Sequence, residues 1–360
     1  AADASGKNAS NKENPYILTL TGRNPMKSQK GKIGKIDVAY ESGTEKDNDI
    51  VFYLPNAASD AEVSCKPLKS SFSLAMREKP GDRTIRIYND TVAVFVGAST
   101  TPEIKVNLAE AIDYIAEQEK TPKGQEYTIS IYKDGYTINA DDIQALKDIW
   151  KDKSPRAKAK KAKKIVWTSK KKKDGTSLNT AATVMVSDNL CLFGTDAITL
   201  KDLTLKGKQA YNIYANGTPL TVSSGVTIQD GKASLYGGSE DATQKGQTIT
   251  VNSNAAFKDV KDFTELTIGN GGTEKCTLTV SGVLDSEPEK KDNTRTGTVS
   301  LKNGELKFAG ATAGHIGNLT ADNHANSINI YKDAAGTKPL KLDRKVTLAT
   351  DKVITLDVNG

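Results

Sequence analysis

The sequence predicts a mainly β fold built from many short strands, and three observations support this prediction. Apolar–polar–apolar triplets recur throughout residues 177–358, as expected for pleated strands that bury one face. The turn-forming residues Gly, Asn, Asp and Ser separate these triplets. Only 37% of the 360 residues are hydrophobic and 6% are aromatic, which favours a thin, extended core over a compact globule.

Nine segments define this array of triplets. They are Ile198-Thr-Leu, Leu203-Thr-Leu, Leu220-Thr-Val, Ile249-Thr-Val, Leu266-Thr-Ile, Leu278-Thr-Val, Val299-Ser-Leu, Ile328-Asn-Ile and Val353-Ile-Thr-Leu. Their spacing is uneven, which favours a coil with two or three strands per turn and loops of variable length over a strict repeat. On this interpretation Leu266 and Leu278 lie on neighbouring faces of one coil, and Leu278 and Val299 stack on consecutive coils.

Composition divides the chain into four regions. Residues 1–14 have the composition of a disordered tail, expected at the start of an exported protein after signal removal or at an expression boundary. Residues 15–90 are β-rich and form either a small β domain or the first coils of the array. Residues 91–175 mix strands and helices and lead into the solenoid, and residues 176–360 are the β-solenoid array itself.

Two or three short helices are predicted in the third region. Asn107 is an N-cap with Glu110 at capping-box spacing, and the residues after it have an apolar stripe. Asn139 is a second N-cap. Ser154 and Pro155 favour the start of a third helix, and Ile165-Val-Trp is predicted to be a short strand.

Four segments together suggest a family. They are Leu108-Ala-Glu-Ala-Ile-Asp-Tyr-Ile, Tyr127-Thr-Ile-Ser-Ile-Tyr, Lys164-Ile-Val-Trp-Thr-Ser and Ile198-Thr-Leu-Lys-Asp-Leu-Thr-Leu. Their combination resembles secreted bacterial right-handed parallel β-helix proteins, the pectin-lyase-like superfold, over residues 91–360. The resemblance implies a right-handed single-stranded parallel β-helix, an amphipathic helix over the open end of the coil, and an extracellular or bacterial cell-surface location. Tandem immunoglobulin-like β-sandwiches are the alternative, although the Cys–Trp–Cys pattern of true members is absent.

The catalytic motifs of that superfold are missing from the chain. Of the polygalacturonase motifs Asn-Thr-Asp, Asp-Asp, Gly-His-Gly and Arg-Ile-Lys, only an Asp pair occurs, Asp141-Asp142, and it falls at a predicted helix start. The pectate-lyase motif Arg-x-Pro-x-x-Arg is also absent. Asp259, Asp262 and Glu265 are expected on an exposed loop, where they are the acids that a diverged enzyme would use.

The histidines and cysteines predict neither a metal site nor a cofactor. His315 and His324 are the only histidines, and both are expected to be solvated residues of turns. Cys65, Cys191 and Cys276 are too few for a disulfide framework, and the last two are expected to be buried thiols within strands.

One strongly basic segment, residues 151–173, stands out from an otherwise mildly acidic chain. It contains twelve Lys and Arg residues against Asp152, a net charge of +11 in a chain whose total is +6. The candidate polyanion-binding residues are Arg156, Lys158, Lys160, Lys161, Lys163, Lys164, Lys170, Lys171, Lys172 and Lys173. A solvated helix and loop explain the same charges. Aromatic residues that would stack on bases are not interleaved, so specific nucleic-acid recognition is not expected.

The leading hypothesis from the sequence is therefore a non-catalytic, adhesin-like protein outside the cell. Its partners would be extracellular glycans or polyanions of a host or cell wall, because a solenoid presents a long, repetitive face. The alternative is a diverged polysaccharide lyase or glycoside hydrolase of the β-helix superfold. No stretch of the chain is long and apolar enough to span a bilayer.

Overall fold

The structure is a computed structural model in which the chain divides into two compact units, Ala1–Asp90 and Thr91–Gly360. In the first unit it describes six strands. In the second it describes residues 91–105, 107–121, 124–172, 175–288, 293–309, 313–331, 340–348 and 355–359.

The first unit contains two separate sheets among its described strands. The strands are β1 (Tyr16–Thr19), β2 (Ile36–Tyr40), β3 (Ile50–Tyr53), β4 (Val63–Pro67), β5 (Leu74–Lys79) and β6 (Thr84–Asn89). Four of them form a sheet in the order β1-β3-β6-β5, and β2 pairs with β4. Strand β6 runs antiparallel to both of its neighbours. The predicted tail, residues 1–14, lies outside the described residues.

The second unit is built from long, mainly parallel sheets, of which the largest has eleven strands. Its order is β32-β29-β26-β23-β20-β17-β14-β11-β9-β7-β8. The strands are β7 (Val92–Val96), β8 (Glu103–Lys105), β9 (Glu126–Ile131), β11 (Lys164–Thr168), β14 (Ala197–Leu200), β17 (Leu220–Val222), β20 (Thr248–Val251), β23 (Glu265–Ile268), β26 (Thr298–Leu301), β29 (Asn318–Ala321) and β32 (Val346–Leu348). Only the pairings of β7 with β8 and β9 are antiparallel.

Three further sheets complete the described part of this unit. A four-stranded sheet contains β10 (Tyr136–Ile138), β12 (Thr183–Val186), β15 (Thr204–Gly207) and β18 (Thr227–Gln229). A five-stranded sheet contains β21 (Ala255–Phe257), β24 (Cys276–Val280), β27 (Gly304–Phe308), β30 (Ser327–Tyr331) and β33 (Thr355–Asn359). A seven-stranded sheet contains β13 (Leu190–Cys191), β16 (Tyr211–Tyr214), β19 (Ala233–Tyr236), β22 (Val260–Lys261), β25 (Val283–Asp285), β28 (Ala313–Ile316) and β31 (Leu340–Leu342).

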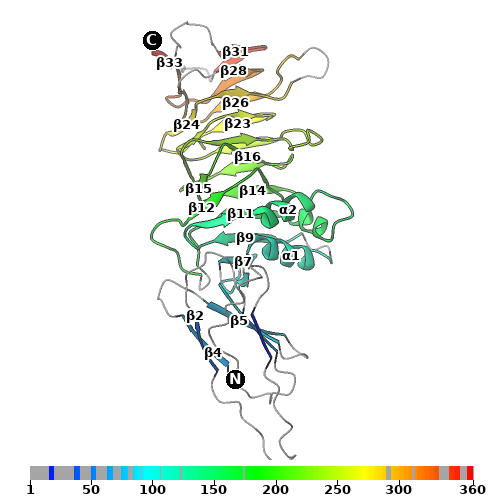
Figure 1. Cartoon of the computed structure of the whole chain (residues 1–360). Helices are drawn as coiled ribbons and strands as arrows, with labels where there is room; N and C mark the ends of the chain where they lie inside the picture. Colours follow the sequence, from blue (N-terminus) through cyan, green and yellow to red (C-terminus); the bar gives the residue numbers. More distant parts are fainter. Residues whose placement is uncertain are drawn as a thin grey trace, which may run out of the picture. The chain divides into compact units, whose positions relative to one another are not determined.

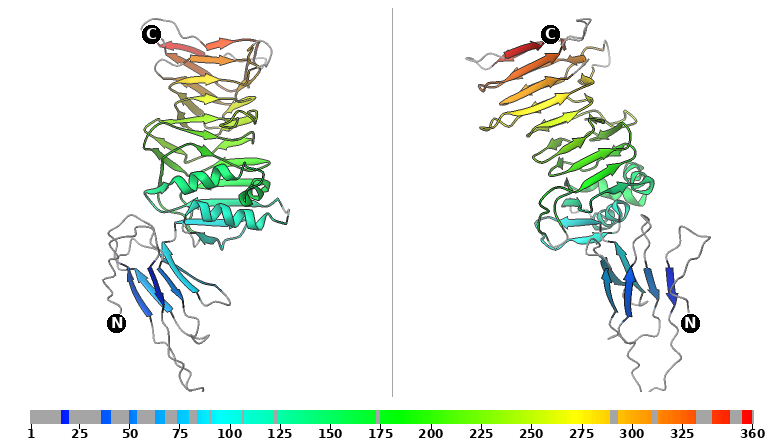
Figure 2. Two further views of the ribbon diagram at one scale, coloured as in Figure 1. Left: turned by 45° about the vertical axis from the view of Figure 1, so that its right-hand side comes forward. Right: turned by 60° about the vertical axis from the view of Figure 1, so that its left-hand side comes forward.

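The chain visits these sheets in a fixed order, and we call one pass a circuit. From β11 to β31 each circuit contributes one strand to the eleven-stranded sheet, one to the four- or five-stranded sheet and one to the seven-stranded sheet. The next circuit adds its strands alongside, so the strands of the second unit rise in layers (Figures 1 and 2). This mainly β arrangement with long parallel sheets is compatible with a β-solenoid.

The register of the eleven-stranded sheet explains why the triplets recur. Apolar residues stack directly on one another, and Ile198 aligns with Leu220, Ile249, Leu266 and Val299. All five are almost completely buried. The central residue of each triplet points to the opposite face of the sheet, where hydroxyl side chains form a column of their own. It consists of Thr199, Thr221, Thr250, Thr267, Ser300, Thr320 and Thr347.

The predicted placement of Leu278 is half right. Leu266 and Leu278 do lie in consecutive strands of one circuit, β23 and β24. Leu278, however, aligns with Ala255 and Leu306 in the five-stranded sheet, whereas Val299 aligns with Leu266 in the eleven-stranded sheet. The prediction that Leu278 and Val299 stack on consecutive coils is therefore wrong. A triplet shows that a strand buries one face, but it does not reveal to which sheet the strand belongs.

The predicted helices form at the expected places. Helix α1 (Leu108–Gln118) begins after Asn107, whose side chain accepts a hydrogen bond from the backbone of Glu110. Helix α2 (Ala140–Asp148) has a complete capping box between Asn139 and Asp142. The third is a 3₁₀ helix, η1 (Pro155–Lys161), capped by Ser154. None of the helices in the described residues has the length and apolarity needed to cross a bilayer.

The helices pack against the first strands of two sheets of the second unit. Helix α2 contacts β13, the first strand of that sheet, and α1 contacts both α2 and the strands β7 and β8. Asp142 is completely buried and links the two helices, because its carboxylate accepts hydrogen bonds from the backbone of Ala109 and from the Tyr136 hydroxyl. The helices are beside the first strands of the second unit in Figure 1.

Candidate ligand-binding site

The second sheet of the circuit is interrupted at one place. Strand β18 ends the four-stranded sheet and β21 begins the five-stranded one, while the flanking strands β17 and β20 remain paired in the eleven-stranded sheet. The corners between these sheets are the turns after β17, β20 and β23. They converge at the interruption and surround a cavity of about 430 Å³.

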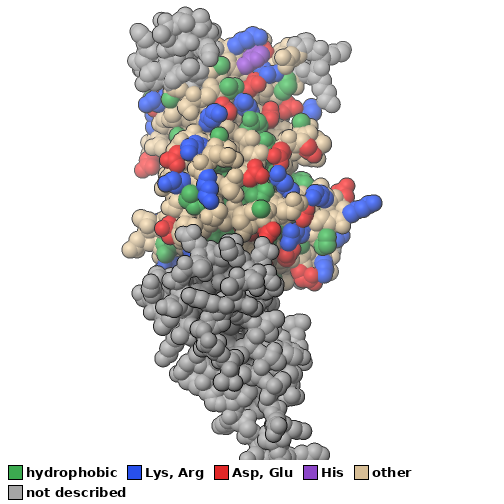
Figure 3. All heavy atoms as spheres, in the orientation of Figure 1, with side chains coloured by type: hydrophobic (Ala, Val, Ile, Leu, Met, Phe, Trp, Pro, Cys, Tyr) green, Lys and Arg blue, Asp and Glu red, His purple; other side chains and the backbone are tan. Residues whose placement is uncertain are grey.

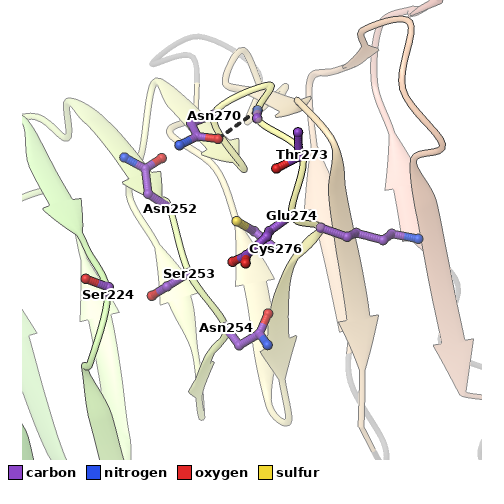
Figure 4. A pocket seen from close by; sticks show the side chains of 10 residues that line it. Ser224, Asn252, Ser253, Asn254, Asn270, Thr273, Glu274 and Cys276 are labelled. Atoms are coloured by element: carbon purple, nitrogen blue, oxygen red, sulfur yellow. Dashed lines mark hydrogen bonds between the residues drawn. The ribbon is translucent and has the colours of Figure 1, made fainter.

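Polar side chains dominate the lining of this cavity. The lining residues are Ser224, Asn252, Ser253, Asn254, Asn270, Gly272, Thr273, Glu274, Lys275 and Cys276. In Figure 4 these side chains come from neighbouring segments and surround a common space. No aromatic residue is among them.

The turn after β23 forms one wall of the cavity because it is longer than its neighbours. It spans residues 269–275, whereas the corresponding turn before it spans residues 252–254. The long turn is held against the next circuit: Gly271 donates its backbone N–H to the carbonyl of Lys302, and the Asn303 amide donates to the carbonyl of Gly272. These bonds fix the wall in place.

Three asparagines of the cavity differ in how their amides are used. The Asn254 oxygen accepts a hydrogen bond from the Thr277 backbone at 2.8 Å, and the Asn270 oxygen accepts one from Gly272 at 2.9 Å. The Asn252 oxygen is buried and has no hydrogen-bond partner among the described residues. A buried acceptor without a donor is costly, so this atom is suited to a ligand donor.

The ionisable groups of the lining are few. The ammonium group of Lys275 donates to the Ser327 hydroxyl at 2.7 Å, on β30. The thiol of Cys276 is buried, which raises its pKa, and the nearby Glu274 carboxylate raises it further. Glu274 carries the single carboxylate among the lining residues. Burial of Cys276 and Cys191 agrees with the prediction, whereas the side chain of Cys65 lies outside the described residues.

The basic segment does not form one continuous surface, because strand β11 divides it. In its first part Arg156 is bound to Asp113 at 2.6 and 3.0 Å and lies 3.5 Å from Asp148. Lys160 pairs with Asp152 at 3.1 Å. Lys158, Lys161 and Lys163 are exposed, with no ion pair within 4.0 Å among the described residues, and Lys164 is half-buried at the start of β11.

The second part of the basic segment follows β11. Lys170 is 3.9 Å from Asp202, and the ammonium group of Lys171 lies 3.7 Å from the centre of the Phe95 ring. Lys172 is half-buried, and Lys173 lies outside the described residues. Basic and acidic side chains are interspersed over the face of the second unit that Figure 3 shows. Of the candidate polyanion-binding residues that the structure describes, Lys158, Lys161 and Lys163 are exposed and have no acidic partner within 4.0 Å in the described part of the chain, and the neighbouring Lys153 is exposed in the same way.

The acids expected on an exposed loop are placed differently. Asp259 is buried and accepts hydrogen bonds from the Ser234 hydroxyl and the Val283 backbone. Asp262 is half-buried at a turn, and Glu265 belongs to strand β23. The prediction of an exposed acidic loop is wrong, because none of the three side chains lies on an exposed loop. The Glu265 carboxylate accepts hydrogen bonds from the hydroxyls of Thr267 and Ser300 within the eleven-stranded sheet.

One of the two histidines, His315, differs from the prediction. His315 lies in strand β28, not in a turn, and its ring nitrogen is 2.7 Å from the Asp343 carboxylate. His324 lies in the turn after β29, 2.8 Å from Asp322. Among the described residues there is no group of three or more His, Cys, Asp and Glu side chains that could hold a metal ion.

Sequence reasoning does not identify the cavity, although its residues carry a weak signal. Asn252-Ser-Asn and the Gly-rich run of residues 269–273 are predicted only as turns between triplets. Comparison of the chain with protein-family models, curated proteins and solved structures finds no match. The geometry of the chain itself therefore carries the evidence for its function.

Proposed function

We propose that this protein is a non-catalytic binding protein that acts outside the cell, with a right-handed parallel β-helix as a rigid scaffold for glycan-binding turns. The observation that carries this proposal is the polar cavity at the interruption between β18 and β21, which has a single carboxylate among its lining residues. Cavities with a few convergent polar groups are the usual place for ligands.

The scaffold role is supported by the register of the eleven-stranded sheet. Its apolar columns hold each circuit against the next, so turns at the sheet corners are repeated at the strand spacing of about 4.7–4.9 Å. Side chains that are far apart in sequence, such as Ser224 and Glu274, thereby line the same cavity. A rigid series of turns suits an extended polymer better than a small, enclosed substrate.

A catalytic role is less well supported by the same cavity. Glycoside hydrolysis commonly uses two carboxyl groups that flank the scissile bond. Glu274 has no second carboxylate beside it among the lining residues, and Asp259 is occupied by hydrogen bonds within the fold.

A broad screen tests this proposal. The full chain is applied to arrays of oligosaccharides and polysaccharides, and the same panel is incubated with the protein to detect new reducing ends or unsaturated products. We expect binding to at least one glycan class without cleavage. Turnover of any member, or binding to none of them, would overturn the proposal.

Polyanion binding is a second candidate, and it is favoured by the exposure of Lys158, Lys161 and Lys163. It predicts retention on heparin that weakens as salt rises. Substitution of these three residues by Glu should abolish retention, whereas the matched change Lys120→Glu should have little effect because Lys120 already pairs with Glu117. Retention that is unchanged in the triple variant would exclude this role for the segment.

A further inference from the structure

We infer that the cavity at the interruption between β18 and β21 binds an uncharged, hydroxyl-rich ring, that is, a neutral sugar unit of a glycan. This inference rests on the proposed function and names the ligand class of the same site. It differs from the acidic sugars implied by the pectin-lyase-like resemblance. Three properties of the lining residues support it: their hydrogen-bonding groups, their charge and their arrangement.

The hydrogen-bonding groups match vicinal hydroxyls. The buried Asn252 oxygen has no donor among the described residues, so a ligand hydroxyl that reaches it can donate a hydrogen bond to it. The oxygens of Asn254 and Asn270 are already engaged by backbone N–H groups, which turns their NH₂ groups into the available donors. A sugar hydroxyl both donates and accepts, so neighbouring hydroxyls can satisfy the two kinds of group together.

The carboxylate of Glu274 disfavours acidic ligands in the cavity. The carboxylate of Glu274 faces the same space as the asparagines in Figure 4, and it contributes to the raised pKa of the Cys276 thiol. The ammonium group of Lys275 is held by the Ser327 hydroxyl on β30, not by Glu274. A ligand carboxylate or sulfate placed here would be repelled, whereas a hydroxyl can donate to Glu274.

The arrangement of the turns sets the direction of the ligand. Ser224, Asn252 and Asn270 come from three successive circuits, so the cavity extends along the direction in which the strands stack. Its volume of about 430 Å³ lies within the range of about 300–1,000 Å³ that is typical of small-molecule sites. The lack of aromatic rings in the lining means that hydrogen bonds supply most of the affinity, and weak binding is expected.

The experiment uses the full chain and two variants. Binding of neutral gluco-, manno- and galacto-oligosaccharides is measured by titration calorimetry and saturation-transfer NMR, with oligogalacturonate as the acidic comparator. We expect binding to a neutral oligosaccharide and none to oligogalacturonate. Asn252→Leu should weaken the neutral ligand about tenfold, because a hydrogen bond to a buried acceptor is lost. Glu274→Gln should allow oligogalacturonate to bind.

Controls separate the site from the rest of the fold. Asn179→Leu changes an exposed asparagine of another turn and should leave binding unchanged. Circular dichroism and thermal unfolding establish that each variant is folded, and a variant that unfolds is replaced by Asn252→Ala, which removes the same acceptor with less bulk.

The outcomes distinguish this inference from the proposed function. If the wild-type chain binds glycans but Asn252→Leu and Glu274→Gln have no effect, the inference fails and the proposed function stands. Binding of acidic glycans alone also overturns the inference. If neutral oligosaccharides bind at this cavity and are cleaved, the ligand class is right and the non-catalytic function is wrong. If nothing in the panel binds, both are overturned.

Discussion

The eleven-stranded sheet and the sheet that follows it in each circuit use similar sequences in different ways. Triplets of the same kind occur in β23 and β24, with Leu266 in the first and Leu278 in the second. The eleven-stranded sheet runs without a break from β8 to β32, whereas the sheet beside it is divided between β18 and β21. The continuous sheet has buried apolar columns, and the divided one leaves a polar cavity at its edge.

A ligand site can form in a layered β fold where one of its sheets is interrupted. A parallel sheet satisfies its backbone groups only when successive strands pair, so an interruption leaves space and polar groups that must be satisfied in another way. Here Ser and Asn side chains of the turns after β20 and β23 bond to backbone groups nearby: Ser253 donates to the Ser223 carbonyl, and the Asn254 and Asn270 oxygens accept from backbone N–H groups. The continuous sheet stabilises the fold through its buried apolar columns, and the interruption provides the polar side chains of the candidate binding site.

The largest expected effect is in the core of the continuous sheet. Leu266 is completely buried, so Leu266→Ala should lower the free energy of unfolding by about 2–5 kcal/mol through lost burial and a residual cavity. Denaturant unfolding of the full chain measures the change. Leu342→Ala is the control, because Leu342 is 36% exposed and should cost far less. Equal losses in the two variants would show that the apolar column does not dominate stability.

A substitution at Gly269, in the turn that follows β23, should lower the stability of the protein nearly as much. Gly269 has φ of 88°, and a Cβ atom there would lie 2.0 Å from the carbonyl oxygen of Lys302. Gly269→Ala should therefore cost about 1–3 kcal/mol and also weaken glycan binding, since it displaces the wall of the cavity. Gly231→Ala separates the two causes: its φ is 58°, but no atom lies within 4 Å of the place that a Cβ would take, so only the conformational cost remains. Unfolding in denaturant compares the two variants, and a smaller loss for Gly269→Ala than for Gly231→Ala would contradict the packing argument.

Replacing Asp262, in the turn that leads into β23, should raise the stability of the protein by an amount that depends on pH. Burial raises the pKa of Asp262, and Glu287 and Asp285 raise it further. The folded state therefore binds this proton more tightly than the unfolded state, and stability falls as the pH rises from the usual aspartate pKa through the raised value. Asp262→Asn should raise stability at pH 7 by about 0.5 kcal/mol or more and give no gain at about pH 3. Asn also tolerates the φ of 55° at this position.

The pKa of Asp241 is shifted in the opposite direction to that of Asp262, so its replacement should have the opposite effect on stability. Hydrogen bonds from Ser239 and Thr243 lower its pKa, so its stabilising contribution is present above the usual aspartate pKa and is lost as the pH falls. Asp241→Asn should reduce stability at pH 7 and lose its effect in acid. Unfolding curves at the two pH values check both variants, and changes of the same sign would refute the assignment.

The smallest effect is expected on the outer face of the continuous sheet. The hydroxyl of Thr221 belongs to the column of Thr and Ser side chains and is half-buried, so Thr221→Val should change stability by no more than about 0.5 kcal/mol. Thr218→Val is the contrasting variant, because the buried Thr218 hydroxyl donates to the Gly194 carbonyl at 2.7 Å, and its loss should cost about 1–3 kcal/mol. Thermal unfolding distinguishes the two, and a large loss at Thr221 would assign a structural role to the column.

Local features of the fold could be predicted because neighbouring residues produce them. Asn107 and Asn139 cap helices where expected, since a side-chain oxygen needs only the next two or three backbone N–H groups. Ile165-Val-Trp forms β11, and Trp167 is buried. The prediction for His315 is wrong because the glycines beside it favour a turn, whereas pairing with Asp285 and Lys341 on both sides makes it part of a strand.

The candidate site could not be predicted for a related reason. Ser224, Asn252 and Glu274 are separated by turns and strands of different lengths, and they meet only because the eleven-stranded sheet aligns β17, β20 and β23. The run of basic residues is conspicuous in the sequence, yet Arg156 and Lys170 lie beside acids from other segments, and Lys160 pairs with Asp152 of the same segment. Charge along a chain does not reveal which partners the fold provides.

The sequence by itself determined that this protein is mainly β, that its strands bury one face, and that helices begin at Asn107 and Asn139. Those properties depend on side-chain alternation and capping, which are local. Only the tertiary structure decided which triplets stack, where the second sheet is interrupted and which polar side chains gather there. Those properties depend on strand register, and register is set by the loop lengths and by the packing of the whole core, so no single segment contains it.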